Sequence, residues 1–463
     1  MKKLTRSLLW LSFLLTVERT WPQAGISTVR GVAHDQSSAV VPSAVVTLTN
    51  TATNVKRSTL TNAAGLYVFP GVVPGPYRIT MSAPSFQNFE GALTVSVQQD
   101  AVVDGTLTLG QTVSQVDVKD VTPMVQVDSP TLGHVLERQR IEQLPINGRS
   151  YQGLLATVPG VDSTGIPQAY GMRTNTSVTL FDGTAVNETY EGWDFSRPPG
   201  LDSIAEMQVE VNNSSAKFTR PMTIILSSKS GTNGFHGALF ETNRNSGYGV
   251  ARRRQDNFTK APYLNRNEFG ASVGGPVFIP KVYNGRNRTF FFFAWEDSRN
   301  LSSTTQQWAV PTEAMRNGDF RGLVDASGRQ YVLYDPLSTN SKTYSREPLT
   351  YRGIANMIDP ARISPTAKYL FSITPLPNQP QINPLIDNNW IGPFASYTNG
   401  SNTSIRIDHH FSDRDLFYGR YSYNTYYQLT SYGGQPMLNR VVTDPEHDGY
   451  SRSCAFCYQG RRQ

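Results

Sequence analysis

The chain contains almost no cysteine. Among its 463 residues there are two cysteines, Cys454 and Cys457, both close to the C-terminus. A C-x-x-C pair can be a redox motif or half of a zinc site, but here no βαβ pattern surrounds it and no second ligand pair accompanies it. We therefore expect neither role, and we expect no disulfide framework in the remainder of the chain.

Long apolar runs and dense charge are also missing. After the N-terminal segment no run approaches about 18 apolar residues, which excludes membrane-spanning helices. Barrel strands are not excluded, because each needs only about ten alternating residues. The formal net charge is +6 and charged residues make up 17% of the chain. The basic run Arg252, Arg253 and Arg254 is neither dense nor interleaved with aromatic residues, so it indicates a solvated loop rather than a nucleic-acid interface.

Motifs of enzyme chemistry are scarce. The sequence has no G-x-S-x-G, P-loop or dinucleotide fingerprint. His134 and Glu137 form an H-x-x-E, the ligand pair of some zinc carboxypeptidases, and His236 could be considered as a third ligand. No catalytic base or substrate-binding arginine is placed after His236, however. His409 and His410 would point to opposite faces of one strand and could not chelate one metal together. We expect no enzyme activity, no bound metal and no cofactor.

The N-terminus has the features of a targeting segment. Lys2, Lys3 and Arg6 form a positive region, and residues 8–15 form a short apolar core. This length suits a signal peptide and is too short for a membrane span. Ala24 is an acceptable last residue before cleavage, so we expect a signal peptide over residues 1–24.

Residues 25–110 have the pattern of a small β-sandwich. Short runs alternate β-branched and polar residues, and Gly and Pro turns separate them. The large apolar residues at period-two spacing, which should face one core, are Tyr67, Phe69, Tyr77, Ile79 and Met81. The segments "NAAGLYVFPGVVPGPYRI" and "SAPSF" resemble the carboxypeptidase regulatory-like domain, a sandwich with a carbohydrate-binding-like fold. That family often has Asp where Asn62 stands and Gly where Ser85 stands. The resemblance implies an independently folded spacer without enzyme chemistry.

One short helical pattern stands out in a chain that otherwise indicates strands. It lies in "EQLPINGRSYQGLLATVPGV", residues 142–161, between Pro145 and Pro159. Its apolar residues, Tyr151, Leu154, Leu155 and Val158, recur at i, i+3, i+4 and i+7, which is the helical period. We expect this face to pack on strands that contain Val178, Leu180, Met207 and Val209. Asn147 and Gly148 should form the preceding turn, with Arg149 at its exposed edge.

This stretch, together with "FDGTAVN", "MQVEVNNSSAKF" and "SSKSGTNGFHGALFETNRN", resembles the plug domain of TonB-dependent outer-membrane transporters. Later segments such as "NEFGASVGGPVF", "RTFFFFAWEDSR", "VPTEAMRNGDF" and "RIDHHFSDRDLFYGRYSYN" are similar to the Oar-like branch, in which a regulatory-like sandwich precedes plug and barrel. The positions that carry the plug motif are Leu144, Pro145, Asn147, Gly148, Arg149, Pro159, Gly160, Asp182 and Gly183. One departure is Arg220-Pro221-Met222, where the family commonly has small residues, because proline fits only an edge or bulge of a sheet.

The segment "TSIRIDHHF" shows the alternation expected of a barrel strand. Ile405, Ile407, His409 and Phe411 fall on one face, and Arg406, Asp408 and His410 fall on the other. An apolar face with aromatic residues at the strand ends is typical of lipid-facing hairpins. The Pro-, Asn- and Ser-rich stretch from about residue 300 to 400 is expected to form long surface loops. Half-buried strands of a soluble β-sandwich adhesin would alternate in the same way.

Together these features predict a mainly β chain: an N-terminal sandwich, a small α/β plug and an incomplete antiparallel transmembrane barrel. The expected boundaries are signal peptide 1–24, sandwich 25–110, tether and plug 111–232, and partial barrel 233–463. We count about five or six convincing barrel strands, whereas transporters of this kind have about 22. The tail "SRSCAFCYQGRRQ" does not alternate. We therefore expect the N-terminal portion of a transporter, not competent for transport by itself.

The resemblance also implies a location and partners. The location is the outer membrane, and the partners are the inner-membrane TonB complex, outer-membrane lipid and an extracellular ligand. Nothing in the sequence identifies that ligand, and carbohydrate is one candidate class. The TonB-contacting box is expected in "VSQVDVKD", at Val113, Val116, Asp117 and Val118, where β-branched residues could pair with a strand of TonB. The other interpretation of this segment is a plain linker. For the whole chain, the alternative is a secreted β-rich adhesion or carbohydrate-binding module.

Overall fold

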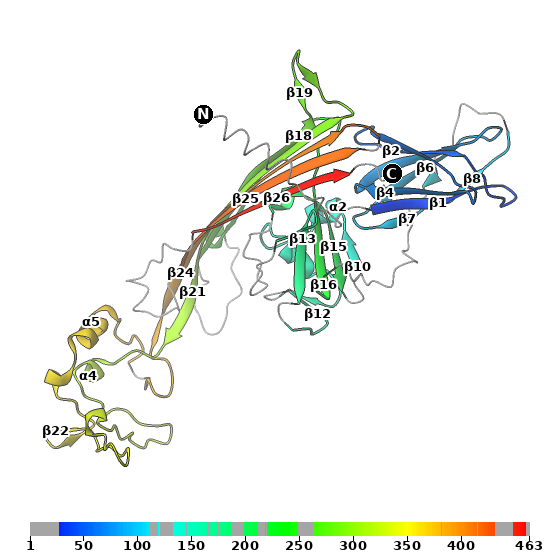
Figure 1. The fold of residues 1–463 in the computed structure, drawn as a ribbon. Helices are drawn as coiled ribbons and strands as arrows, with labels where there is room; N and C mark the ends of the chain where they lie inside the picture. Colours follow the sequence, from blue (N-terminus) through cyan, green and yellow to red (C-terminus); the bar gives the residue numbers. More distant parts are fainter. Residues whose placement is uncertain are drawn as a thin grey trace, which may run out of the picture.

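The computed structural model describes three parts: a sandwich, a middle domain (within residues 133–228) and a strand wall (the six long strands from residue 236 onward), shown in Figure 1. No helix in the described ranges is long and apolar enough to cross a membrane. The described residues are 27–110, 119–120, 133–144, 146–163, 167–173, 176–186, 199–211, 218, 220–248, 263–380, 382–413, 415–430 and 448–459.

The sandwich consists of two facing sheets. In one sheet β1 pairs with β4, β7 and β8, and in the other the order is β3-β2-β5-β6-β9. The five apolar residues predicted to share a core are all buried in one cluster between the sheets, which confirms that prediction. The strands are β1 Ser27–Asp35, β2 Val45–Asn50, β3 Lys56–Leu60, β4 Leu66–Val72, β5 Gly75–Ser82, β6 Phe89–Val95, β7 Asp100–Val102, β8 Gly105–Leu107 and β9 Lys119–Asp120.

A polar turn leads into β4. The side-chain oxygen of Asn62 accepts hydrogen bonds from the backbone N–H groups of Ala64 and Leu66, each at 2.9 Å. Gly65 follows with a φ of +70°, which glycine adopts at little cost. Asn62 thus supplies the acceptor oxygen that an Asp would supply at this position.

The middle domain is a five-stranded mixed sheet of order β10-β15-β16-β13-β14, with short helices on one face. β16 pairs in parallel with β13 and antiparallel with β15. A single apolar cluster joins the helices to the sheet. The elements are β10 Gly133–Leu136, α2 Arg138–Gln143, α3 Gln152–Leu155, β11 Val161–Asp162, β12 Gln168–Ala169, β13 Ser177–Phe181, β14 Thr184–Ala185, η1 Leu201–Ser203, β15 Ile204–Val211 and β16 Met222–Ser228.

The predicted helical stripe is confirmed, although α3 itself is only one turn long. Tyr151, Leu154, Leu155 and Val158 are all buried, and they share a core with Met207 and Val209. The strand that contains Val178 and Leu180, β13, also packs on this stripe, as expected. The Tyr151 hydroxyl lies 3.1 Å from the Thr179 hydroxyl, so β13 turns Thr179 and Phe181 toward the helices. Because side chains alternate along a strand, Val178 and Leu180 face the other side of the sheet.

The unusual Pro221 does not interrupt the sheet. It lies directly before β16, whose residues are buried along the whole strand. A proline immediately before a strand leaves the hydrogen-bonded ladder intact. The neighbouring Arg220 donates from Nη1 to the carbonyl oxygen of Ser177, 2.9 Å away. This departure from the family pattern is therefore compatible with a regular central strand.

The strand wall is an antiparallel meander of order β17-β18-β21-β24-β25-β26. Within the described residues its outer strands, β17 and β26, do not pair with each other, so the sheet is open. Short turns such as residues 411–415 lie at one end and long connections at the other. The strands are β17 His236–Asn245, β18 Leu264–Pro276, β21 Thr289–Trp308, β24 Trp390–His410, β25 Leu416–Thr430 and β26 Asp448–Gln459; η2 Ser246–Tyr248 and the small hairpin of β19 Phe278–Ile279 and β20 Tyr283–Asn284 lie between them.

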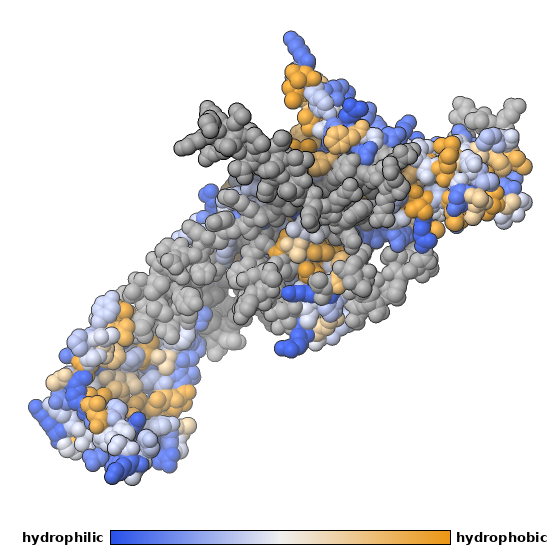
Figure 2. All heavy atoms as spheres, in the orientation of Figure 1, coloured by the Kyte–Doolittle hydropathy of each residue, from blue (hydrophilic) through white to orange (hydrophobic). Residues whose placement is uncertain are grey.

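The longest described connection forms a small module at the far end of β21 and β24 (Figure 1). The expected loop region of about 300–400 is shorter, because β21 continues to Trp308 and β24 begins at Trp390. The module surface mixes hydrophobic and hydrophilic residues (Figure 2). Its elements are α4 Glu313–Arg316, η3 Pro336–Ser338, β22 Thr350–Tyr351, β23 Ile354–Ala355, η4 Pro360–Arg362 and α5 Pro365–Ile373.

The predicted alternation is confirmed near the C-terminal end of β24. Ile405 and Ile407 are 40% and 47% exposed on one face of the wall. Arg406 and Asp408 are buried on the other face. That second face lies against the middle domain, so this part of β24 has an apolar outer side and a polar inner side.

Candidate functional site

Two groups of charged side chains join the middle domain to the strand wall. The first, called here the Asp182 cluster, comprises Asp182, Ser228, Arg406, Asp408 and Arg420. The second, called the Arg149 cluster, comprises Arg138, Arg149, Asp202, Glu268 and Glu296. Each cluster takes residues from both parts.

Asp182 is placed by a tight hairpin turn. Asp182 and Gly183 connect β13 to β14 with φ values of +47° and +83°. Asp-Gly is the sequence preferred for a two-residue turn of this kind. The Asp182 carboxylate then accepts from the Ser228 backbone N–H at 2.8 Å and from the Ser228 hydroxyl at 2.7 Å. The motif thus holds a buried carboxylate at the edge of the middle domain.

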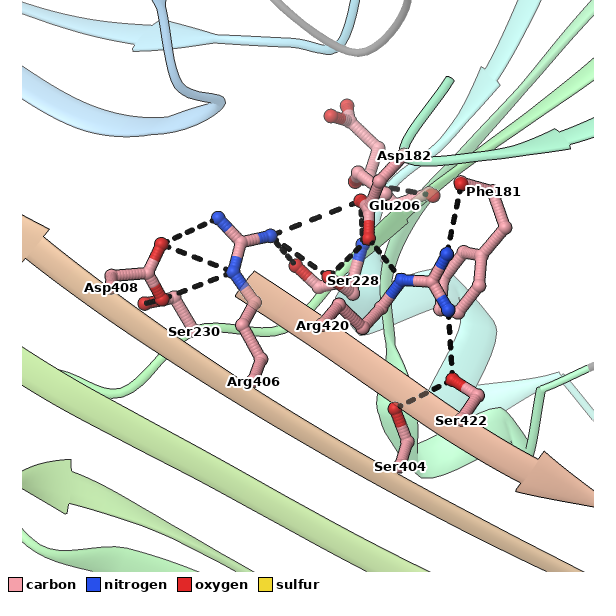
Figure 3. Close-up of polar contacts among 11 residues, drawn as sticks. Phe181, Asp182, Glu206, Ser228, Ser230, Ser404, Arg406, Asp408, Arg420 and Ser422 are labelled. Atoms are coloured by element: carbon pink, nitrogen blue, oxygen red, sulfur yellow. Dashed lines mark hydrogen bonds and ion pairs between the residues drawn. The ribbon is translucent and has the colours of Figure 1, made fainter. Parts of the chain in front are cut away.

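Arg420 of β25 reaches this carboxylate from the wall (Figure 3). Its side chain is fully buried, and its Nε lies 2.7 Å from Asp182 Oδ2. The same guanidinium donates to the Phe181 carbonyl at 3.1 Å and to the Ser422 hydroxyl at 2.8 Å. It also stacks 3.8 Å from the centre of the Phe181 ring. Such multiple bonding is what a buried guanidinium requires.

Arg406 of β24 links the two carboxylates of the cluster (Figure 3). Its Nη2 lies 2.7 Å from Asp408 Oδ1, and its Nη1 lies 3.8 Å from Asp182 Oδ1. Nη1 also donates to the carbonyl and hydroxyl oxygens of Ser228, at 3.0 and 2.8 Å. Two carboxylates and two guanidinium groups balance each other, so burial leaves no net charge in the Asp182 cluster.

The sequence analysis expected Arg149 at an exposed edge of the turn, and this expectation is wrong. Its side chain is 25% exposed, and its Nη2 lies 2.9 Å from Asp202 Oδ1. Its Nε lies 3.3 Å from Glu296 Oε2 of β21, and its guanidinium covers the Phe240 ring of β17 at 3.7 Å. The turn at Gly148, with a φ of +92°, directs the chain toward the wall. The wall partners of Arg149 are Glu296 and Phe240, which are distant in the sequence and could not be predicted from the pattern around Arg149.

A cavity of about 200 Å³ lies beside the Arg149 cluster, between the middle domain and the β17–β18 part of the wall. Arg138 lies on the side of the cavity that the middle domain forms. Its Nη1 donates to the carbonyl oxygens of Leu201 and Ile204, each at 2.8 Å. The residues that line the cavity from both sides include Arg138, Arg149, Asp202, Thr242 and Glu268. The middle domain also contributes Ile141, Leu144, Ile146 and Leu201, so the cavity has polar and apolar walls and room for a few water molecules.

The remaining plug-motif residues serve different purposes. Asn147 contacts the wall through Arg266, whose Nη1 lies 3.2 Å from Asn147 Oδ1. Leu144 packs against the apolar cluster of the middle domain. Pro159 and Gly160 form an exposed turn, with Gly160 at a φ of +77°. Pro145 lies outside the described residues. The structure therefore brings Asn147, Gly148, Arg149 and Asp182 to the wall.

Several further candidates are placed elsewhere or fall outside the description. His134 lies in β10, Glu137 precedes α2 and His236 begins β17. In the described part of the chain no group of three or more His, Cys, Asp or Glu residues could hold a metal ion. Cys454 and Cys457 lie in β26. The signal-peptide segment 1–24 and the TonB-box candidates Val113, Val116, Asp117 and Val118 lie outside the described residues.

Sequence reasoning missed most wall residues of both clusters. Arg406 and Asp408 were assigned to a polar strand face, but without a partner. Arg420, Glu268 and Glu296 were not singled out. The available signal was the alternation itself, because a charge on the inner face of a lipid-facing strand must meet either water or protein.

Comparison with known proteins agrees with this architecture. Residues 28–108 match the carboxypeptidase regulatory-like domain, and residues 227–453 match the outer membrane beta barrel domain. The chain is 23% identical over 301 residues to the TonB-dependent transporter Oar of Myxococcus xanthus, a match that covers 60% of this chain and 28% of that transporter.

Solved structures of siderophore receptors are also similar. The ferric enterobactin receptor of Pseudomonas aeruginosa has a TM-score of 0.40 at 9% identity, covering 72% of this chain and 39% of that one. The siderophore receptor PirA of Acinetobacter baumannii has a TM-score of 0.39 at 13% identity, covering 71% and 37%.

The two domain matches establish the general class and the location of this protein. It is a mainly β protein of the outer membrane that carries a carboxypeptidase regulatory-like domain and an outer membrane beta barrel domain.

Proposed function

We propose that this outer-membrane chain acts as a TonB-dependent receptor for an extracellular ligand, and not as an enzyme, with the middle domain as its plug. The chain covers 28% of the Oar transporter, so uptake is proposed for a protein with a complete barrel. The observation that carries the proposal is the Asp182 cluster, in which a buried and charge-balanced set of ion pairs ties the middle domain to the inner face of the wall.

A polar interface suits a plug that must both seal and move. An apolar interface would resist separation in water in proportion to its area. Ion pairs, by contrast, can be replaced by hydration once water enters. Arg406 illustrates this, because it holds Asp408 of its own strand at 2.7 Å and Asp182 of the middle domain at 3.8 Å. If Asp182 withdraws, Arg406 keeps a carboxylate partner.

The force for this movement would come from TonB through the segment between sandwich and middle domain. Val113, Val116 and Val118 are β-branched residues, and the backbone of such a stretch could add to a partner's sheet. Pulling on this segment would load the middle domain from its N-terminal side. The ion pairs with the wall are the contacts that this load must separate.

We test the proposal by photo-crosslinking in cells, with the full chain in the outer membrane and a photoreactive residue at Val116. The matched control places the same residue at Val332, which is exposed in the loop module at the other end of the wall. We expect a TonB adduct from position 116 alone. Val118→Pro should abolish that adduct, because proline removes a backbone donor and fixes φ.

The outcome that contradicts the proposal is equally specific. If a scan of positions 111–120 yields no TonB adduct, the box is not in this segment. If, in addition, a salt wash releases the chain from the membrane fraction, the chain is a secreted β-rich module instead.

A further inference from the structure

The sandwich does not stand apart from the rest of the protein. It lies beside the middle domain and beside the short-turn end of the wall (Figure 1). It touches each of them through a different loop. The loop Ser96–Gln99, between β6 and β7, meets β15 of the middle domain. The loop after β2 meets the rim of the wall.

The contact with the middle domain is centred on Glu206. This carboxyl group is 7% exposed, and its Oε2 accepts from the backbone N–H of Val97 at 2.7 Å. Val97 is itself buried, yet it belongs to neither the sandwich core nor the core of the middle domain. Val97 thus bonds to the middle domain from outside both apolar cores.

The contact with the wall uses Asn233, just before β17. The Asn233 N–H donates to the Ala52 carbonyl at 3.1 Å, and its side-chain Nδ2 donates to the Thr53 carbonyl at 2.6 Å. The Asn233 Oδ1 accepts from the Asn287 N–H at 2.8 Å, which ties this point to the turn before β21. The sandwich is thus bonded to both sides of the boundary between middle domain and wall.

We propose that the sandwich is a docked clamp on the middle domain and the wall rim, and that protonation of Glu206 controls this docking. The ligand of this surface is a segment of the same chain, the loop Ser96–Gln99. Docking itself is independent of transport. Its consequence, that the plug cannot leave while the clamp is closed, rests on the proposed function.

The surroundings of Glu206 explain why a proton should matter. Burial raises the pKa of Glu206 to about 7, against hydrogen bonds from Val97 and Ser96 that lower it. Among the described residues, the charged group that acts on it is another carboxylate, Glu137 at the start of α2, which raises the pKa further. Among the described residues, no basic side chain forms an ion pair with Glu206. The carboxylate form is therefore poorly stabilised at the docked interface.

The sign of the pH dependence follows from linkage. A carboxyl group whose pKa is higher in the docked state binds its proton more tightly there. The stabilisation of the docked state by protonated Glu206 is fully present at pH values below the ordinary pKa of glutamate. That support is lost as the pH rises through about 7. The clamp is closed in acid and weakened above neutrality.

A second observation fits an interface that opens. In Gln98, next to Val97, both side-chain polar atoms are buried without a hydrogen-bond partner in the described part of the protein. Buried amides are normally bonded, and an unbonded one weakens the contact that buries it. Undocking would return this amide to water.

The test is hydrogen exchange of the Val97 amide in the full chain in detergent micelles, from pH 4 to 8.5. Glu206→Gln, which keeps the shape and remains uncharged, is compared with the wild type at each pH, so the intrinsic pH dependence of exchange cancels. We expect equal rates at pH 4, below the ordinary pKa of glutamate. As the pH rises, the wild type should exchange progressively faster than Glu206→Gln, by at least about tenfold at pH 8.5, and the difference should level off above about 7. Glu241→Gln, an exposed change on β17, should match the wild type throughout.

The clamp would be disproved if wild type and Glu206→Gln exchange alike at every pH, or if Val97 is unprotected in both at pH 4. Protection of the β16 amides in the same experiment shows whether each variant is folded. If Glu206→Gln does not fold, the pH titration of wild-type Val97 relative to the β16 amides decides the question. None of these measurements requires TonB, so their outcome is separate from that of the crosslinking test.

Discussion

Arg420 is among the largest side chains that the described fold buries completely, and its position shows how single residues hold the parts together. A buried guanidinium is costly unless every donor is satisfied. Asp182, Phe181 and Ser422 accept its hydrogen bonds. Asp182 is therefore the residue on which the charge balance of the Asp182 cluster depends.

Asp182→Ala should destabilise the folded chain by about 3–5 kcal/mol, because it removes the carboxylate that pairs with the buried Arg420, whereas Arg406 keeps Asp408. Asp182→Asn should cost less, since the amide oxygen still accepts from Ser228. Hydrogen exchange of the Ser228 amide in micelles measures both effects. Asp319→Ala, which breaks an exposed ion pair with Arg321 in the loop module, should leave that rate unchanged. Equal exchange in Asp182→Ala and the wild type would refute the role of the cluster.

At the scale of elements, the one-turn helix α3 is held by tertiary contacts. Four helical residues without a side-chain cap are far too few to be stable alone. Leu154 and Leu155 bury completely against β15 and β16, within the same apolar cluster. The helix is therefore an anchor that follows the turn at Gly148 and positions Arg149.

Leu154→Ala should lower the free energy of unfolding of the middle domain by about 2–5 kcal/mol, because it removes a fully buried side chain. Exchange of the β16 amides under increasing urea gives this value. The control is the same substitution at Leu337, which is 82% exposed in the loop module. A loss as large at Leu337 as at Leu154 would show that the effect is not one of packing.

The whole molecule is arranged about the wall, with the sandwich at the end of short turns and the loop module at the other end. The outer face of β24 carries Ile405 and Ile407, and the inner face carries the Asp182 cluster. In the outer membrane the isoleucine face should meet lipid. The same strand thus faces lipid on one side and the middle domain on the other.

Ile407→Arg should reduce the amount of chain in the outer membrane, because an arginine that faces lipid costs free energy, up to about 2–4 kcal/mol at the bilayer midplane and less toward the interfaces. Membrane fractionation followed by urea extraction measures the loss. Ile354→Arg, at a comparably exposed position in the loop module, should have no effect. Equal losses for both variants would argue against a lipid-facing surface at Ile407.

The sequence alone determined the features that depend on local pattern. Period-two spacing placed Tyr67 through Met81 in one sandwich core, and the i, i+3, i+4, i+7 spacing placed Tyr151 through Val158 on one buried face. Alternation also separated Ile407 from Arg406. These periods are properties of the backbone and need no knowledge of partners.

The tertiary structure decided which partners those faces meet. Strand β13 was expected to pack on the helix, but strand parity in the folded sheet decided that Thr179 and Phe181 face it while Val178 and Leu180 face away. Arg149 was expected at the surface, and it is instead paired with Asp202 and Glu296. Arg420 and Asp182 are separated by 238 positions in the chain. Only the approach of the middle domain to the wall makes them neighbours, because an ion pair depends on distance in space and leaves no periodic signal in the sequence.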